Sequence, residues 1–236
     1  MIQVEKKIIS DEDLTYSFLS LLSTNQKKKV IESQKQSYND FKAISHSQIK
    51  IVLIGEGAVG KTTLRLKFMG EDSTHGLYIS TLGADFSLKF VDIENDSVMV
   101  QIWDIAGQSR FKEIVSGYFA NSNGAMVVYD LTRMESFEQT KYWLDHLFSI
   151  TGPIPFCIIG NKLDIAPIHN PIFDDLVSEA DNTVKKLNDY VKEEYGFEVH
   201  HFLTSAKSGE NVDNAFHLLT SDILKLLKKN STSLDR

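Results

Sequence analysis

One stretch of the sequence has the residue types and spacing of a loop that binds phosphate groups. Gly55-Glu56-Gly57-Ala58-Val59-Gly60-Lys61-Thr62 matches the pattern G-x-x-x-x-G-K-[ST] and lies between an apolar strand and a predicted helix. Glycines let the backbone turn its N–H groups inward, and the N-terminus of a helix adds partial positive charge. Lys61 is expected to reach the terminal phosphates, and Thr62 to bind magnesium through its hydroxyl. The predicted nucleotide contacts here are Gly55, Glu56, Gly57, Ala58, Val59, Gly60, Lys61, Thr62 and Thr63.

A second motif predicts which base is bound. Asn161-Lys162-Leu163-Asp164 directly follows an apolar strand, and the Asp164 carboxylate can accept hydrogen bonds from N1–H and the 2-amino group of guanine. Adenine offers neither donor in that arrangement, and leaving a buried polar group unpaired is a strong means of rejecting a ligand. Ser205-Ala206-Lys207 follows the last predicted strand, where a backbone N–H is expected to meet the guanine oxygen. The sequence therefore favours a guanine nucleotide.

A third motif supplies groups for the third phosphate. In Asp104-Ile105-Ala106-Gly107, Asp104 is expected to hold the magnesium ion through water. The backbone N–H of Gly107 is expected to approach the γ-phosphate. A site with these groups can distinguish GTP from GDP.

The elements that position these motifs alternate in type. From about residue 48 onward, short apolar runs alternate with helical patterns. This alternation predicts an α/β fold, in which a mostly parallel sheet has helices on both faces. The runs 85–93 and 98–105 are close enough to form a hairpin with one antiparallel edge strand. We expect the other strands at 49–55, 124–131, 155–162 and 198–204, and helices near 61–69, 110–120, 136–150, 181–195 and 212–229.

With these motifs in this order, residues 48–229 resemble a small GTPase of the Ras superfamily, and within it they most resemble Rab proteins. The stretches that carry the Rab resemblance are YISTLGADF at 78–86, WDIAGQSRF at 103–111 and VVYDLTRMESF at 127–137. The resemblance implies a P-loop small G domain with a six-stranded sheet. It also implies a GTP/GDP switch that binds magnesium and hydrolyses GTP, in vesicle trafficking or signalling.

The resemblance further implies roles for individual residues. Thr81 would reach magnesium and the γ-phosphate and order the first mobile loop, and Gly107 would order the second. Gln108 would orient the attacking water. The implied catalytic residues are Gln108, Thr81, Lys61 and Gly107; the implied metal ligands are Thr62, Thr81 and Asp104; and Tyr78 and Thr81 join the nucleotide contacts.

Partner proteins are expected at the two mobile segments. By resemblance, effectors, an exchange factor and a GTPase-activating protein would bind residues 78–86 and 103–118. Phe86, Trp103 and Tyr118 match an aromatic trio that Rab proteins present to partners. The alternative is that the three rings belong to the core, as aromatic residues at strand and helix positions usually do.

Three segments depart from the G domain. Residues 1–47 are predicted as an extension with a short amphipathic helix and a linker, and docking on the G domain, membrane binding and partner binding remain open as its role. Residues 166–180 are predicted as an insertion that is either a surface elaboration or a partner site. Residues 230–236 are predicted as a disordered tail.

Composition narrows the class of protein. The net charge of −7 disfavours nucleic-acid binding, which needs a concentrated basic face. No apolar run approaches the roughly 18 residues of a membrane span. We therefore expect a cytoplasmic protein. We also expect a monomer. The C-terminal stretch NSTSLDR contains no cysteine, so we expect no lipid anchor there and recruitment to membranes only through a partner.

Two competing functions remain. One is a scaffold protein that binds guanine nucleotide with little hydrolysis, against which Gly57, Thr81 and Gln108 argue. The other is a P-loop nucleotide kinase, against which the motifs at 161–164 and 205–207 argue. GTP hydrolysis is the function that the sequence favours.

Overall fold

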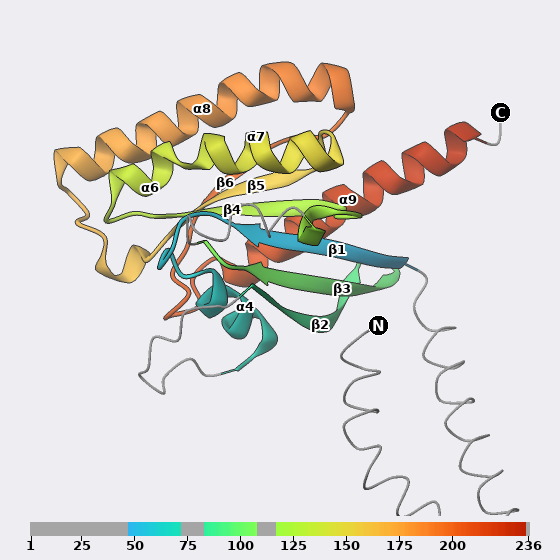
Figure 1. Cartoon of the computed structure of the whole chain (residues 1–236), viewed down its shortest axis with the longest axis horizontal. Coiled ribbons are helices and arrows are strands. Elements are labelled where there is room, and N and C mark those ends of the chain that lie inside the picture. Colours follow the sequence, from blue (N-terminus) through green and yellow to red (C-terminus); the bar gives the residue numbers. More distant parts are fainter. Residues whose placement is uncertain (1–46, 72–82, 108–116, 235–236) are drawn as a thin grey trace, which may run out of the picture. The chain divides into compact units, whose positions relative to one another are not determined.

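The structure, a computed structural model, describes residues 47–71, 83–107 and 117–234. Its strands are β1 (Ser47–Ile54), β2 (Ala84–Ile93), β3 (Asp96–Ile105), β4 (Gly124–Asp130), β5 (Phe156–Asn161) and β6 (His200–Leu203). They form one sheet in the order β2-β3-β1-β4-β5-β6 (Figure 1). The β2–β3 hairpin is antiparallel and every other neighbouring pair is parallel. The predicted α/β fold with one antiparallel edge strand is confirmed.

Helices cover both faces of the sheet. They are α4 (Lys61–Met69), α6 (Met134–Glu138), α7 (Thr140–Thr151), α8 (Pro171–Tyr195) and α9 (Val212–Leu234), with a short 3₁₀ turn, η2 (Leu163–Ile165). α4 and α9 pack on one face, and α6, α7 and α8 on the other (Figure 1). All residues of β4 and β5 are buried, as expected for parallel strands covered on both faces. These two strands end at the edge where the candidate site lies.

A buried cation ties helix α4 to strand β2. Arg65 of α4 is 7% exposed, and its Nη2 lies 2.8 Å from Asp85 Oδ2 on β2. Its Nη1 donates to Ser87 Oγ at 2.5 Å. The start of β2, which follows the first predicted mobile loop, is thereby fixed against the helix that follows the phosphate loop. Arg65 lies outside the predicted site residues.

Several predicted helix boundaries were wrong. The helix expected at 136–150 begins at Met134 and is divided at Gln139 into α6 and α7. The last helix, expected to end at 229, continues to Leu234, so residues 230–234 of the predicted disordered tail are helical. No glycine or proline follows Lys229 to end that helix. The helix expected at 110–120 lies mostly outside the described residues, although residues 117–119 are helical.

The stretch predicted as an insertion supplies the beginning of α8. This helix starts at Pro171, not at 181, and runs without a break to Tyr195. Asn170 caps it, accepting a hydrogen bond from the Ile172 N–H at 3.0 Å. Asparagine followed by proline is a strong start signal for a helix. Phe173 is buried against the sheet, so part of this stretch belongs to the core of the domain.

Within the described residues, none of the helices has both the length and the apolar character needed to cross a membrane. β1 begins at Ser47, one residue before the predicted start of the G domain at 48. The predicted N-terminal helix lies outside the described residues.

Candidate functional site

The phosphate loop leaves β1 through backbone conformations that few side chains adopt. Gly55 has a φ of 136° and Gly60 a φ of 100°. A Cβ on Gly55 would overlap the backbone oxygen of Val128, so the position requires glycine. Ala58 also has a positive φ, 64°, despite its methyl group. Such a conformation costs about 1–2 kcal/mol outside glycine, a strain that the motif alone does not reveal.

The Lys61 ammonium lies inside this loop. Lys61 is 5% exposed, and its Nζ donates to Gly55 O at 2.9 Å and Glu56 O at 2.7 Å. Burial lowers the pKa of Lys61 to about 8, although the negative charges of Asp104 and Glu56 act in the opposite direction. A buried cation with little compensating charge is stabilised by a bound anion. The geometry therefore supports the predicted contact between Lys61 and phosphate.

The lowered pKa of Lys61 leads to a prediction about pH. Its pKa falls from 10.5 to about 8 on folding, so between these values the unfolded chain binds more protons. The free energy of unfolding of the nucleotide-free protein therefore gains a contribution from Lys61 that rises between pH 8 and 10.5. Lys61→Met removes the buried charge, so we expect it to be more stable than wild type at pH 7 by as much as about 3 kcal/mol. Urea unfolding at pH 7 and pH 10 measures the difference, which should shrink at the higher pH.

Lys141→Met is the matched control, because the Lys141 side chain is 82% exposed and pairs with Asp145 on the helix surface. We expect this variant to follow the pH dependence of the wild type. A Lys61→Met protein with the stability of wild type at both pH values would contradict the assignment of a costly buried charge.

Thr62 and Asp104 meet beside the loop. Thr62 Oγ1 donates to Asp104 Oδ2 at 2.5 Å, and Asp104 is 1% exposed. Both are hard oxygen donors, which magnesium prefers, and magnesium commonly takes its other ligands from phosphate and water. The residues present therefore fit the predicted metal. Thr81, the third predicted ligand, lies outside the described residues.

Gly107 lies directly against the phosphate loop. A Cβ built on it would overlap Gly55 O, the Glu56 carbonyl carbon and Lys61 Nζ. The chain can pass this close to the loop only because residue 107 has no side chain. This contact brings the Gly107 backbone close to the Lys61 ammonium. Such proximity is required if both residues are to contact the third phosphate, as predicted.

Asn161 joins the base-binding motifs to the phosphate loop. It is 1% exposed, and its Nδ2 donates to Val59 O at 2.9 Å. Its Oδ1 accepts from the Ala206 N–H at 2.9 Å and from Thr204 Oγ1 at 3.3 Å. One buried amide thus holds together the ends of β1, β5 and β6. The Ala206 N–H, one of the groups expected to meet guanine, is engaged within the protein by this bond.

The Asp164 carboxylate, which is expected to select guanine, is held in place by residues of the motif at 205–207. Ser205 Oγ donates to Asp164 Oδ1 at 2.7 Å, and Lys207 Nζ lies 3.9 Å from Asp164 Oδ2. The Asp164 side chain is 22% exposed. A carboxylate that is fixed by one neighbour and still open to solvent can accept further donors from a ligand. The structure therefore brings together the two sequence motifs predicted to bind the base.

Replacing Asn161 should cost both stability and nucleotide affinity. Asn161→Ala leaves Val59 O and the Ala206 N–H buried without a partner, at about 1–3 kcal/mol each. We expect the free energy of unfolding to fall by about 2–4 kcal/mol, and GDP to give weaker protection. Asn188→Ala is the control, because Asn188 makes a similar pair of bonds to Val199 away from the site, at 2.9 and 2.6 Å.

Urea unfolding with and without GDP measures both quantities. Asn188→Ala should lose stability but keep the full increment that GDP adds to the wild type. If Asn161→Ala kept that increment as well, Asn161 would be a structural residue only.

Two charged residues at and just after the end of β4, Asp130 and Arg133, are not among the predicted site residues. The Asp130 side chain is 2% exposed, and its Oδ2 lies 2.7 Å from Lys162 Nζ and 3.3 Å from Arg133 Nε. Burial raises the pKa of Asp130, but hydrogen bonds from Lys162 and Thr132 outweigh burial, and the net shift is downward. The signal that was available is a fully apolar strand that ends in an aspartate. Lys162 is thus placed beside the base-binding residues by a group outside the recognised motifs.

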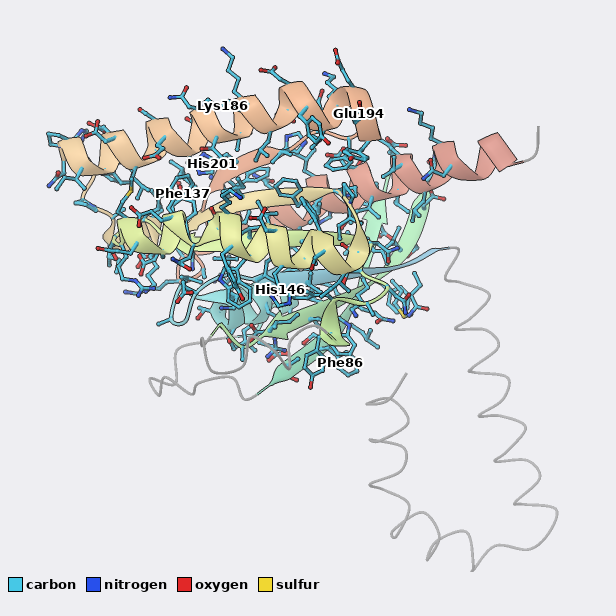
Figure 2. All side chains as sticks on the ribbon, turned by 45° about the horizontal axis from the view of Figure 1, so that its top comes forward. Phe86, Phe137, His146, Lys186, Glu194 and His201 are labelled. Carbon is cyan, nitrogen blue, oxygen red and sulfur yellow. The ribbon has the colours of Figure 1, made fainter. Side chains whose placement is uncertain are left out.

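The three aromatic residues form a packed cluster on the hairpin side of the sheet. The Phe86 and Trp103 rings stack at 5.1 Å, and Trp103 and Tyr118 lie 6.0 Å apart. Lys50 Nζ lies 4.5 Å above the Trp103 ring and donates to the Tyr118 carbonyl at 2.6 Å. Figure 2 shows Phe86 on β2, at the edge of the sheet away from α7 and α8. All three rings are partly exposed, so packing and partner contact are both compatible with their placement.

Tyr78, Thr81 and Gln108 lie outside the described residues, as do most of the segments 78–86 and 103–118 that were expected to bind partners. The described site residues are those predicted to bind the base, the first phosphates and the metal. They come from the carboxyl ends of β1, β3, β4, β5 and β6, which meet at one edge of the sheet.

Known proteins share this arrangement of motifs. A family model described as the Ras family matches residues 50–225. The Ras-related protein Rab-13 of Bos taurus is 39% identical over 185 residues, which cover 78% of this chain and 83% of that protein. The GTP-binding protein YPTM1 of Zea mays is 38% identical over 189 residues (79% and 83%), and Rab-8B of Pongo abelii is 34% identical over 182 residues (76% and 80%). The chain therefore belongs to the Ras family, as a small GTPase similar to Rab proteins.

Proposed function

We propose that this protein is a switch that binds GTP and GDP together with magnesium and hydrolyses GTP to GDP. The observation that carries the proposal is the Asn161 side chain. Its bonds to Val59 O and the Ala206 N–H tie a phosphate-binding loop to the loops that present Asp164. A base that donates to Asp164 and phosphates that reach Lys61 would thus be bound by one connected unit.

The proposed reaction breaks the bond between the γ-phosphorus and the bridging oxygen as a water oxygen attacks, and yields GDP and inorganic phosphate. Positioning and electrostatic stabilisation do most of the work in such transfers. Lys61 would neutralise charge on the terminal phosphates, and the Gly107 N–H would donate to the γ-phosphate. Thr62 and Asp104 would hold magnesium, which supplies further positive charge there. By family resemblance, Gln108 would orient the water and Thr81 would complete the metal site.

Loss of the third phosphate would release Thr81 and Gly107 and change the surface that partners read. We propose effectors, an exchange factor and a GTPase-activating protein as those partners, with residues 78–86 and 103–118 as their contact surface. The Phe86–Trp103–Tyr118 cluster and the Lys50 contacts that hold it support this, because they fix the described part of that surface. The protein would act in the cytoplasm as a monomer, in vesicle trafficking or signalling.

Competition binding tests the nucleotide assignment. A fluorescent N-methylanthraniloyl GDP (mant-GDP) is bound to the full chain in magnesium buffer and challenged with excess unlabelled nucleotide. GDP and GTP should displace the label and ATP should not, because only guanine supplies the two donors that Asp164 can accept. Removal of magnesium with EDTA should accelerate release. Equal displacement by ATP would overturn the guanine assignment.

A further inference from the structure

The turn after β4 contains a charge network around the buried Asp130 carboxylate, a residue that belongs to none of the recognised nucleotide motifs. Asp130 Oδ1 accepts hydrogen bonds from the Thr132 N–H at 2.9 Å and Thr132 Oγ1 at 2.7 Å. Its Oδ2 faces Lys162 Nζ at 2.7 Å and Arg133 Nε at 3.3 Å. Ser136 Oγ closes the turn, since it accepts from the Asp130 N–H at 2.9 Å and donates to the Arg133 carbonyl at 2.6 Å. The carboxylate is therefore held rigidly between two cations.

Each cation leads to a different part of the nucleotide site. Lys162 stands between Asn161 and Asp164 in the base-binding motif. Arg133 reaches the phosphate loop, where its Nη2 donates to Gly57 O at 2.9 Å. One buried carboxylate thus links the loop that presents Asp164 to the loop that would surround the phosphates. This link is independent of Asn161, which connects the same two loops through Val59.

We propose that Asp130 and Arg133 are positioning residues that set how long a guanine nucleotide remains bound. The proposal rests on the function proposed above and extends it to the rate of nucleotide release. Asp130 fixes the Lys162 ammonium, so the methylene stem of Lys162 has one position beside the base. Arg133 ties the phosphate loop to the same carboxylate, so that loop cannot open without separating charged partners. Charge-assisted hydrogen bonds of this kind are about twice as strong as neutral ones.

A turn that merely folds the chain is the competing account. Asp130 also braces Thr132 at the start of α6, so its loss could lower stability and leave release unchanged. Arg133 separates the two accounts, because its side chain is 45% exposed and, within the described part of the chain, its guanidinium bonds only to Gly57 O and Asp130. Arg133→Gln removes that reach without opening the core. Asp130→Asn keeps the size and an acceptor for Thr132 and removes the charge.

The experiment measures mant-GDP dissociation from the full chain in magnesium buffer, beside thermal unfolding of the same proteins. We expect Asp130→Asn to release GDP about 10–30-fold faster and Arg133→Gln about 3–10-fold faster than wild type. The double variant, Asp130→Asn with Arg133→Gln, should release GDP less rapidly than the product of the two single accelerations predicts. The two residues contact each other, so each single variant already removes their shared ion pair. Lys141→Gln is the control: it also removes a surface cation from an ion pair, with Asp145, and should release GDP at the wild-type rate.

A second readout separates positioning of Lys162 from reading of the base edge. Inosine diphosphate lacks the 2-amino group of guanine, from which Asp164 would accept a hydrogen bond. Because Asp130 does not touch that edge, Asp130→Asn should accelerate release of GDP and inosine diphosphate by the same factor.

The outcomes are distinct. Wild-type release rates in both Asp130→Asn and Arg133→Gln would overturn the proposal, even if thermal stability fell. A change in the ratio between GDP and inosine diphosphate would assign Asp130 to base selection and would also overturn it. A wild-type chain that does not bind mant-GDP at all would refute the proposed function instead.

Discussion

Asp164→Asn is expected to change the base that the protein binds, from guanine to xanthine. Guanine presents N1–H and a 2-amino group, both donors, and the Asp164 carboxylate has acceptors only. Asparagine places an amide NH₂ against the 2-amino group, so one donor faces another and a polar group is left unpaired. Mismatches of this kind are rejected by about 10⁴–10⁵ in the strongest cases, and we expect at least about a 10³-fold loss of GDP affinity.

Xanthine has a carbonyl in place of the 2-amino group and therefore accepts a hydrogen bond from the introduced amide. We expect Asp164→Asn to bind xanthosine diphosphate more tightly than GDP, in fluorescence titrations with both nucleotides. Ser205 Oγ, which donates to Asp164 Oδ1 at 2.7 Å, can donate to the amide oxygen of asparagine and hold the new side chain. Asp145→Asn, on an exposed helix surface, is the matched control and should keep GDP affinity. GDP affinity unchanged in Asp164→Asn would show that Asp164 does not contact the base.

Gly107→Ala is expected to abolish most GTP hydrolysis while leaving GDP bound. The added methyl group would overlap Gly55 O and the Glu56 carbonyl carbon, which are backbone atoms of the phosphate loop, so the segment at 107 must move away. Its N–H then loses its place beside the third phosphate. Removal of one preorganised donor lowers kcat by about 10²–10³-fold in other enzymes, and we expect a loss of at least about 100-fold.

Gly117→Ala is the matched control, because a Cβ there meets no atom of the described residues within 4 Å. We expect it to hydrolyse GTP like the wild type. GDP has no γ-phosphate, so it does not use the hydrogen bond that the Gly107 N–H would donate to that group. We therefore expect Gly107→Ala to bind GDP within about tenfold of wild type. Single-turnover assays with GTP-loaded protein, and equilibrium titrations with mant-GDP, measure the two effects. Equal hydrolysis by Gly107→Ala and Gly117→Ala would remove Gly107 from the proposed reaction.

The fold was largely predictable because its strands carry strong local signals. β4 and β5 are continuous apolar runs, and the hairpin of β2 and β3 joins strands only a few residues apart. Motifs of fixed spacing then placed Lys61, Thr62 and Asp164 at strand ends. Such signals are local, so a single sequence suffices to read them.

The errors in the helices came from boundary signals that were overlooked. Asn170-Pro171 marks the start of α8, and Phe173 and Leu176 continue its buried face. The long segment between Asp164 and Ser205 led to the prediction of an insertion at 166–180, although residues 171–180 are part of helix α8. The last helix continued past its predicted end at 229 because no glycine or proline follows Lys229 to end it.

The charge networks were not predictable, because their partners are far apart in the chain. Arg133 reaches Gly57 across 76 positions, and Arg65 reaches Asp85 across 20. Nothing in the local sequence distinguishes Arg133 from an ordinary surface arginine. Tertiary structure alone shows that Asp130 gathers Lys162 and Arg133 around one carboxylate.

A single-turnover assay tests the central proposal, that the protein cleaves the third phosphate of bound GTP. The full chain is loaded with GTP, freed of excess nucleotide, and followed in magnesium buffer by phosphate release and by chromatography of the bound nucleotide. We expect one phosphate per bound GTP, with GDP retained, at a rate of order 10⁻⁴ s⁻¹, the intrinsic rate of Ras itself. GTP that is still bound and intact after about a day, many half-lives at that rate, would contradict the account.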